Sequence, residues 1–176
     1  MIRFLAPHIR LENVCQLSLE RLRQEQWESL LLDVDCTLAR YREQLVAPEV
    51  AAWIEELRSG GIGLCLVSNG LGGRIGRLAE KLGVRFIARA CKPFPFRLKA
   101  AVQKMDFDPA RTAMVGDQLF ADVLAGRLAG MKTVLVRPIH PEDEPWFTRL
   151  KRGPERFLLR RFAVEVESPA QPARSR

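Results

Sequence analysis

Two aspartates and a threonine follow an apolar stretch in the first quarter of the chain. Residues 30–32 are leucines, and Asp33, Asp35 and Thr37 come next at every second position. Side chains alternate between faces along an extended strand, so the two carboxylates can project to one side, where they repel unless a cation or a proton intervenes. The pattern therefore indicates a buried strand that opens into a site for Mg²⁺ and phosphate chemistry. A strand that ends in an ordinary polar turn would have a similar local sequence.

Other polar residues stand where later apolar stretches end. In chain order they are Ser68 with Asn69, then Lys92, then Asp117 with Asp122. Carboxylates are ligands for a hard cation such as Mg²⁺, whereas a hydroxyl and an amine can hold phosphate oxygens. If the apolar stretches are strands of one sheet, acids, a hydroxyl and an amine converge on one rim of that sheet.

Strands and helices alternate from the first aspartates onward. Five strands joined by right-handed helical crossovers predict an α/β fold, a Rossmann-like doubly wound and mostly parallel sheet with helices on both faces. Ligands bind such sheets outside the carboxyl ends of the strands, where the polar residues stand. The predicted strands are the stretch that leads to Asp33, 63–67, 84–88, 112–115 and 131–136, and the predicted helices are 48–59, 72–82, 95–105 and the segment between 117 and 129.

Length and composition favour one domain in a reducing compartment. A chain of 176 residues, 47% of them hydrophobic, is long enough for one core and too short for two ordinary domains. We expect one domain over 1–162, in which 1–27 is an arm that docks on the core, and a disordered tail at 163–176. Four scattered cysteines argue against a zinc site or disulfides, and no apolar stretch is long enough to span a bilayer, so we expect a cytoplasmic protein.

Positive charge is concentrated near the end of the chain. The net charge is +7, and residues 145–162 contain six Lys or Arg residues against one Glu. This segment could contact an anionic membrane or a nucleic acid, or face only water, because basic solvated helices are common. Gly153 and Pro154 predict a break into two short helical pieces. Membrane contact would use Arg149, Arg152, Arg156 and Arg160 around the apolar residues Trp146, Phe147, Leu150, Phe157, Leu158 and Phe162.

The polar motifs, taken together and in this order, resemble those of the haloacid dehalogenase superfamily of phosphohydrolases. The resemblance covers about residues 28–137, and it depends on the joint occurrence of four motifs. Cys36 is a departure, because close relatives more often carry a small or amide residue there. The motifs are Asp33-Val34-Asp35-Cys36-Thr37, Ser68 after a strand, Lys92, and Gly116-Asp117-Gln118-Leu119-Phe120-Ala121-Asp122.

The resemblance implies a role for each candidate residue. Asp33 would attack the phosphorus atom and become an aspartyl-phosphate. Asp35 would protonate the leaving alcohol and later deprotonate the attacking water. The residues that bind substrate would be Thr37, Ser68, Asn69 and Lys92, and Mg²⁺ would lie among Asp33, the backbone carbonyl of Asp35 and Asp117, with Asp122 steadying the metal shell or Lys92.

The spacing of the motifs leaves no room for the inserted cap domain that covers the site in many superfamily members. Residues 38–63 hold only a loop and one helix. Residues 70–91 hold only one helix and one strand. An open site suits a phosphate presented on something large. Among capless members the chain is most similar to the YqeG-like subfamily, whose relatives include mitochondrial phosphatidylglycerophosphate phosphatases. That similarity implies a phospholipid head group as substrate and contact with the inner face of a membrane.

Three alternative functions are compatible with a phosphatase fold of this kind. A phosphatase of a soluble phosphosugar or nucleotide would share every catalytic residue. A nucleic-acid 3′-phosphatase would also use an open, positive site, but the sequence has no basic groove interleaved with aromatics of the kind that stacks bases, so we expect no nucleic-acid partner. A non-catalytic scaffold on a phosphatase fold would have no reason to keep Asp33, Asp35, Lys92 and Asp117 together.

Overall fold

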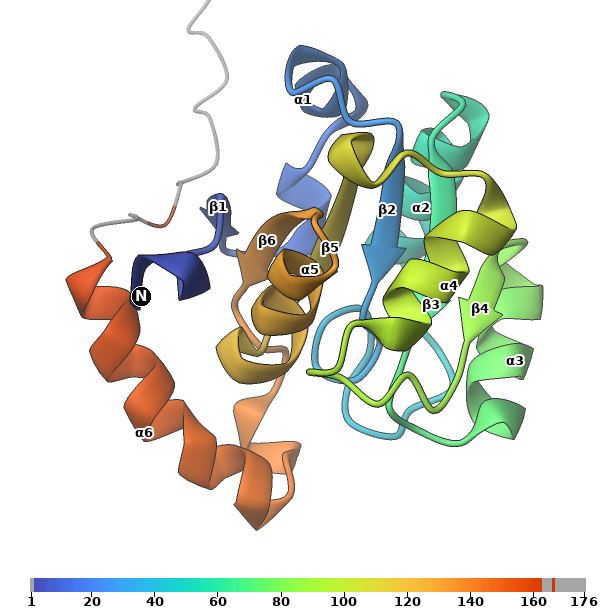
Figure 1. Ribbon diagram of the computed structural model, residues 1–176. Coiled ribbons are helices and arrows are strands. Elements are labelled where there is room, and N and C mark those ends of the chain that lie inside the picture. Colours follow the sequence, from blue (N-terminus) through green and yellow to red (C-terminus); the bar gives the residue numbers. More distant parts are fainter. Residues whose placement is uncertain (1, 163–165, 167–176) are drawn as a thin grey trace, which may run out of the picture.

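The structure is a computed structural model, which describes residues 2–162 and residue 166. A six-stranded sheet forms its centre, and every strand pairing in it is parallel (Figure 1). Apart from residue 166, the tail predicted at 163–176 lies outside the described residues. In spatial order the strands are β1 (Ile9–Leu11), β6 (Lys132–Val136), β5 (Thr112–Gly116), β2 (Ser29–Leu32), β3 (Gly63–Val67) and β4 (Arg85–Ile87).

Helices pack on both faces of the sheet, as the predicted fold class requires. Successive residues of β2 point to opposite faces, so Leu30 and Leu32 join one apolar cluster and Leu31 joins another. Residues of α1, α2 and α3 complete the first cluster, and residues of α4 and α5 complete the second. The helices are α1 (Leu19–Gln24), α2 (Pro48–Ser59), α3 (Gly72–Leu82), α4 (Phe96–Met105), α5 (Leu124–Leu128) and α6 (Trp146–Arg161), with the π-helix η4 (Leu119–Val123) and the 3₁₀ turns η1 (Ile2–Leu5), η2 (Val14–Gln16), η3 (Pro109–Arg111) and η5 (Pro141–Asp143).

The N-terminal arm contributes a strand that the sequence did not predict. Ile9 pairs with Val134 and Leu11 with Val136, which makes β1 a sixth strand beside β6. Both Ile9 and Leu11 are buried in the core. A three-residue strand shows too little alternation to be recognised by its period, so only its packing on β6 identifies it.

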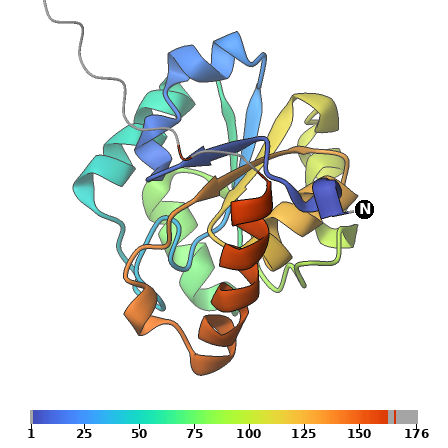
Figure 2. The same cartoon turned by 90° about the vertical axis from the view of Figure 1, so that its left-hand side faces the viewer.

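The C-terminal segment is one helix, and the predicted break at Gly153 and Pro154 is wrong. Helix α6 continues through Pro154 (Figure 2). Proline removes one backbone hydrogen bond, but packing of a helix can outweigh an unfavourable local sequence. Here Leu158 and Phe162 pack against Leu119 and other buried residues, so they are not the exposed apolar residues that the membrane hypothesis assumed. Within the described residues, no helix is long and apolar enough to cross a membrane.

The connections that follow β2 and β3 are short. The chain from β2 to α2 is a loop, and α3 with β4 fills the path from β3 to α4. Neither connection contains an inserted domain, which agrees with the predicted capless fold. The carboxyl ends of β2, β3 and β5 therefore lie together without a covering domain from these connections.

Candidate active site

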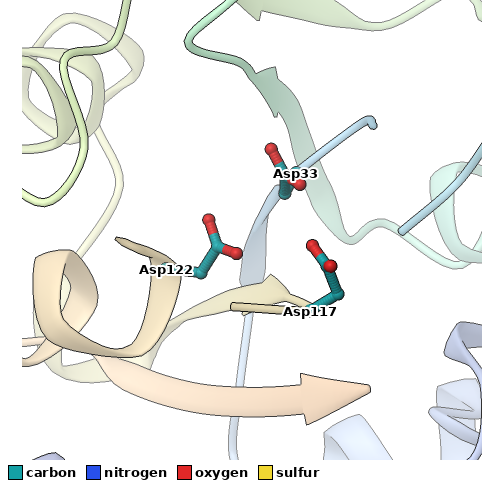
Figure 3. Close-up of side chains that lie close together, drawn as sticks. All are labelled: Asp33, Asp117 and Asp122. Carbon is teal, nitrogen blue, oxygen red and sulfur yellow. The ribbon is translucent and has the colours of Figure 1, made fainter. Parts of the chain in front are cut away.

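Three buried carboxylates meet at the carboxyl ends of two central strands. Asp33 follows β2, Asp117 follows β5, and Asp122 lies in η4 (Figure 3). One oxygen from each lies within 4.8 Å of the others. Gly116 permits this approach, because a Cβ at that position would collide with the side chain of Asp122. Three converging carboxylates are a donor set that suits a hard divalent cation.

The side chain of Lys92 supplies positive charge to this cluster. Its Nζ lies 2.5 Å from Asp33 Oδ1 and 2.6 Å from Asp122 Oδ1, and it donates to the carbonyl oxygen of Val67 at 3.1 Å. Burial lowers the pKa of Lys92, but Asp122 and Asp33 more than compensate, so the net shift of its pKa is upward. Lys92 therefore stays a fixed positive charge beside the Asp33 carboxylate.

Burial also acts on the acids. It raises the pKa of Asp33 to about 7, against the opposing effect of Lys92, and the neighbouring Asp122 adds to the rise. Burial likewise raises the pKa of Asp117, although Arg152 acts in the other direction. Buried carboxylates that lie close together are unfavourable in their charged form, so the cluster favours the binding of a cation beside its oxygens.

The carboxylate of Asp35 is not part of the three-carboxylate cluster and has its own partners. It accepts hydrogen bonds from Arg74 Nη2 at 2.5 Å and from the backbone N–H of Arg42 at 2.9 Å. Ser68 Oγ lies 3.5 Å from the same carboxylate. The side chain of Asp35 is thus partly exposed, in a position where it can reach a group outside the cluster.

The predicted substrate-binding residues differ in what they contact. Thr37 Oγ1 lies 3.3 Å from Asp33 Oδ2 and 3.2 Å from Asp117 Oδ1, so its hydroxyl bridges two carboxylates of the cluster. Ser68 Oγ accepts from the backbone N–H of Gly70 at 3.0 Å. Thr37 and Ser68 are buried beside the acids, as Lys92 is.

Asn69 holds the backbone of Lys92. Its Nδ2 donates to the carbonyl oxygen of Lys92 at 3.0 Å, and its Oδ1 accepts from the Lys92 N–H at 2.8 Å. This pair of hydrogen bonds fixes the point from which the Lys92 side chain extends. In the structure Asn69 is therefore placed to position Lys92.

Cys36 lies between Asp35 and Thr37 of the first motif, and its side chain is buried. Its φ of 65° is in the left-handed region, which is uncommon for a residue other than glycine. Burial raises the pKa of its thiol, and the nearby Asp117 and Glu144 raise it further. The thiol is thus held in its protonated form.

Sequence reasoning missed two arginines at the site. Arg152 of α6 donates to the carbonyl oxygen of Asp117 at 2.6 Å and also pairs with its carboxylate. Arg74 holds Asp35. Arg152 was assigned to the basic surface, and its burial beside Asp117 corrects that assignment. The only signal in the sequence was the presence of acids, Glu144 and Glu155, on either side of Arg152, and both accept hydrogen bonds from it.

The sequence is similar to those of known hydrolases and phosphatases. Residues 9–130 match a hydrolase family described as haloacid dehalogenase-like hydrolase. The probable phosphatase YqeG of Bacillus subtilis (strain 168) is 32% identical over 157 residues, which is 89% of this chain and 91% of that protein. Phosphatidylglycerophosphate phosphatase 1 of Arabidopsis thaliana, chloroplastic/mitochondrial, is 24% identical over 169 residues, or 91% of this chain and 49% of that protein.

Solved structures support the fold. The 3-deoxy-D-manno-octulosonate 8-phosphate phosphatase of Moraxella catarrhalis, solved with magnesium, phosphate and a sugar, aligns with a TM-score of 0.51 at 14% identity, over 81% of this chain and 94% of that one. At such identity the likeness concerns the fold alone. The family match covers more than half of the chain, and the two relatives that are similar over most of its length are described as a probable phosphatase and a phosphatase. The chain therefore belongs to the haloacid dehalogenase-like hydrolases, and it is a phosphatase of that family.

Proposed function

We propose that this enzyme is a Mg²⁺-dependent phosphomonoesterase that works through an aspartyl-phosphate on Asp33, and that its substrate is phosphatidylglycerophosphate. The observation that carries the proposal is the position of Asp33. Its carboxylate is buried at the end of β2, with Lys92 Nζ at 2.5 Å and the hydroxyl of Thr37 at 3.3 Å. A nucleophile held this rigidly beside a fixed positive charge is suited to in-line attack on phosphorus.

The chain's own residues account for both halves of the reaction. An oxygen of Asp33 forms a bond to phosphorus while the bond to the leaving alcohol breaks, and Lys92 balances the charge that develops on the phosphoryl oxygens. Asp35 gives its proton to the leaving oxygen. It then takes a proton from the water that attacks phosphorus, which breaks the bond from phosphorus to Asp33 and releases inorganic phosphate. Arg74 holds the carboxylate of Asp35 outside the three-carboxylate cluster, where it would meet the leaving group of a substrate bound at Asp33.

The carboxylates of Asp33, Asp117 and Asp122 would hold the metal ion. Their oxygens converge within 4.8 Å, which fits a cation that takes oxygen ligands. A bound Mg²⁺ would supply further positive charge to the phosphoryl oxygens. Lys92 already neutralises part of the cluster, so the residues present would bind one such ion without leaving a large uncompensated charge.

Two observations support a lipid as substrate. The site is open because no cap is inserted, so a phosphate carried by a bilayer can approach it. Helix α6 beside the site exposes Trp146, Leu150 and Phe157, with exposed fractions of 76%, 71% and 59%. Aromatic and apolar side chains among Lys and Arg residues are typical of surfaces that lie on anionic membranes. We propose that this face of α6 contacts the membrane peripherally, at its inner leaflet.

A phosphate-release assay with purified protein tests the substrate. Phosphatidylglycerophosphate in mixed micelles should be hydrolysed with the highest kcat/KM of a panel that includes glycerol 3-phosphate, a phosphosugar and a nucleoside monophosphate. A soluble ester that clearly exceeds the lipid would establish the alternative, a phosphatase of a soluble metabolite. If the protein hydrolyses no compound of the panel in a way that depends on Asp33, the proposal as a whole is contradicted.

A further inference from the structure

A cavity lies beside the active site, between α6 and the edge of the sheet formed by β1 and β6. Its volume is about 800 Å³. Asp117 lines it, so the cavity opens next to the carboxylate cluster. Five arginines also line it, and we call this space the arginine cavity: Arg10, Arg137, Arg149, Arg152 and Arg156.

The acidic residues of the arginine cavity are already engaged within the protein. Arg152 pairs with the carboxylates of Asp117, Glu144 and Glu155. Glu142 pairs with His140. Among the described residues, in contrast, no carboxylate forms an ion pair with Arg149 or Arg156, two residues of α6 that line this space. The cavity thus offers at least two guanidinium groups to an external anion.

The rest of the lining is apolar. Leu11 at the end of β1, Leu135 of β6 and Leu159 of α6 contribute to the wall. A ligand that fits such a surface carries a negative charge next to carbon-rich groups. Arginine is well suited to the anion in such a ligand, because its guanidinium can bind two phosphate oxygens at once.

We infer that the arginine cavity binds a second anionic group of the substrate, a phosphodiester that belongs to the leaving group. The inference rests on the proposed function, in which the reacting phosphomonoester lies at Asp33. In phosphatidylglycerophosphate one glycerol unit joins the phosphomonoester to the phosphodiester. With the monoester at the carboxylate cluster, the diester reaches past Asp117 into the cavity, where Arg149 and Arg156 bind its oxygens. The enzyme therefore selects phosphomonoesters that carry a neighbouring phosphodiester.

The test measures binding of a phosphodiester that the enzyme cannot hydrolyse. Dihexanoyl phosphatidylglycerol, used as dissolved monomers, has the diester without the monoester. It is titrated calorimetrically into wild-type protein, into the cavity variant Arg149→Gln/Arg156→Gln, and into the control Lys151→Gln/Arg160→Gln. The control removes the same charge from the same helix at exposed positions that do not line the cavity.

We expect wild type and control to bind the lipid equally, and the cavity variant to bind it about tenfold or more weakly, as the loss of charged hydrogen bonds predicts. Equal binding by all three proteins, or no binding by wild type, would overturn the inference. A parallel titration with inorganic phosphate separates the two sources of the anion. If phosphate alone binds as tightly and with the same dependence on the two arginines, the cavity is a simple phosphate site and the inference fails.

Kinetics distinguish this inference from the proposed function. The cavity variant should lose kcat/KM for dihexanoyl phosphatidylglycerophosphate by about tenfold or more while it keeps its rate on glycerol 3-phosphate, which has no diester. If wild type hydrolyses the lipid and the cavity variant does so equally well, the cavity inference is wrong and the proposed function stands. If wild type does not hydrolyse the lipid but still binds the diester through these arginines, the proposed substrate is wrong and the cavity assignment stands.

Discussion

Arg152 of α6 pairs with the carboxylate of Asp117, a member of the carboxylate cluster, and donates to the Asp117 carbonyl oxygen at 2.6 Å. The same guanidinium also contacts Glu144 and Glu155. One positive charge from the C-terminal helix thus compensates three acids at the site. The two residues are 35 positions apart in sequence, and their contact attaches α6 to the catalytic end of the sheet.

Replacing Arg152 with glutamine should strongly destabilise the fold. Three buried carboxylates would lose their common partner, and breaking a buried ion pair in this way typically costs about 3–5 kcal/mol. Denaturant unfolding measures the change in the free energy of unfolding. Lys151→Gln, at an exposed position next in sequence, should change it by less than about 0.5 kcal/mol. Equal stability of the two variants would show that the Arg152 network does not support the fold.

Replacing Asp33 with asparagine should abolish turnover. The amide has nearly the same shape but cannot form the phosphoryl bond, so we expect kcat to fall by more than about a hundredfold. Because the change removes a buried charge without removing volume, the variant should unfold no more easily than wild type. Phosphate release and denaturant unfolding are measured on the same preparation. A folded variant with more than about a hundredth of the wild-type rate would exclude Asp33 as the nucleophile.

Removal of divalent cations should silence the enzyme. We expect EDTA to stop phosphate release and excess Mg²⁺ to restore it, since the three carboxylates require a cation for substrate to approach. Asp117→Asn should raise the Mg²⁺ concentration needed for half-maximal rate. Ser59→Ala, on α2 away from the cluster, should leave that concentration unchanged. Full activity in the chelator would contradict the metal assignment.

Acid should weaken the attachment of β1. His8 precedes β1, and its Nδ1 accepts a hydrogen bond from the backbone N–H of Thr133 at 2.9 Å. Partial burial, with Arg127 and Lys132 nearby, lowers the pKa of His8 from 6.5 to about 4.

The unfolded chain therefore takes up a proton on His8 as the pH falls below about 6.5, before the folded protein does. The His8 contribution to stability is complete above that pH and is lost progressively down to about pH 4. Its size is modest because the side chain is substantially exposed. Unfolding at pH 7 and pH 5 should show a smaller difference for His8→Gln than for wild type. An identical difference would show that His8 does not titrate in this way.

Vesicle flotation tests membrane contact through α6. Wild type should float with anionic vesicles at low salt and be released at high salt, because each Lys or Arg near an anionic leaflet contributes about 1 kcal/mol. Trp146→Ser/Leu150→Ser should float less, since it removes exposed apolar side chains without changing the charge. Arg152 is unsuitable as a target because it is bound at the active site. Wild type that stays in solution at low salt would refute the membrane proposal.

Much of the site could be predicted from the sequence, because its residues directly follow strands that are recognisable as continuous apolar stretches. Ser68 follows β3 and Asp117 follows β5, and the carboxyl ends of parallel strands share one rim. The structure brings Asp33, Lys92 and Asp117 together at that rim, while the catalytic roles of these residues stay predictions. The sequence also predicted α3 with its bounds, since a glycine with a left-handed backbone ends it.

What the sequence could not reveal depends on long-range packing. Arg152 and Asp117 meet only because α6 folds back on the sheet, and apart from the flanking acids Glu144 and Glu155 the local sequence does not distinguish Arg152 from the other basic residues of the helix. The direction of the Asp35 side chain depends on Arg74, which lies on another element. Continuity of α6 through Pro154 likewise follows from tertiary contacts of Leu158 and Phe162.

The two outermost strands, β1 and β4, are each three residues long. An exposed strand edge is a template for pairing with another chain, and its hazard grows with its length. Here each edge offers only a few main-chain groups, and β4 carries the charged Arg85 at an exposed position. Edge-to-edge association between copies of this sheet is therefore disfavoured. The protein could therefore reach a high density on a surface without aggregating through pairing of its strand edges.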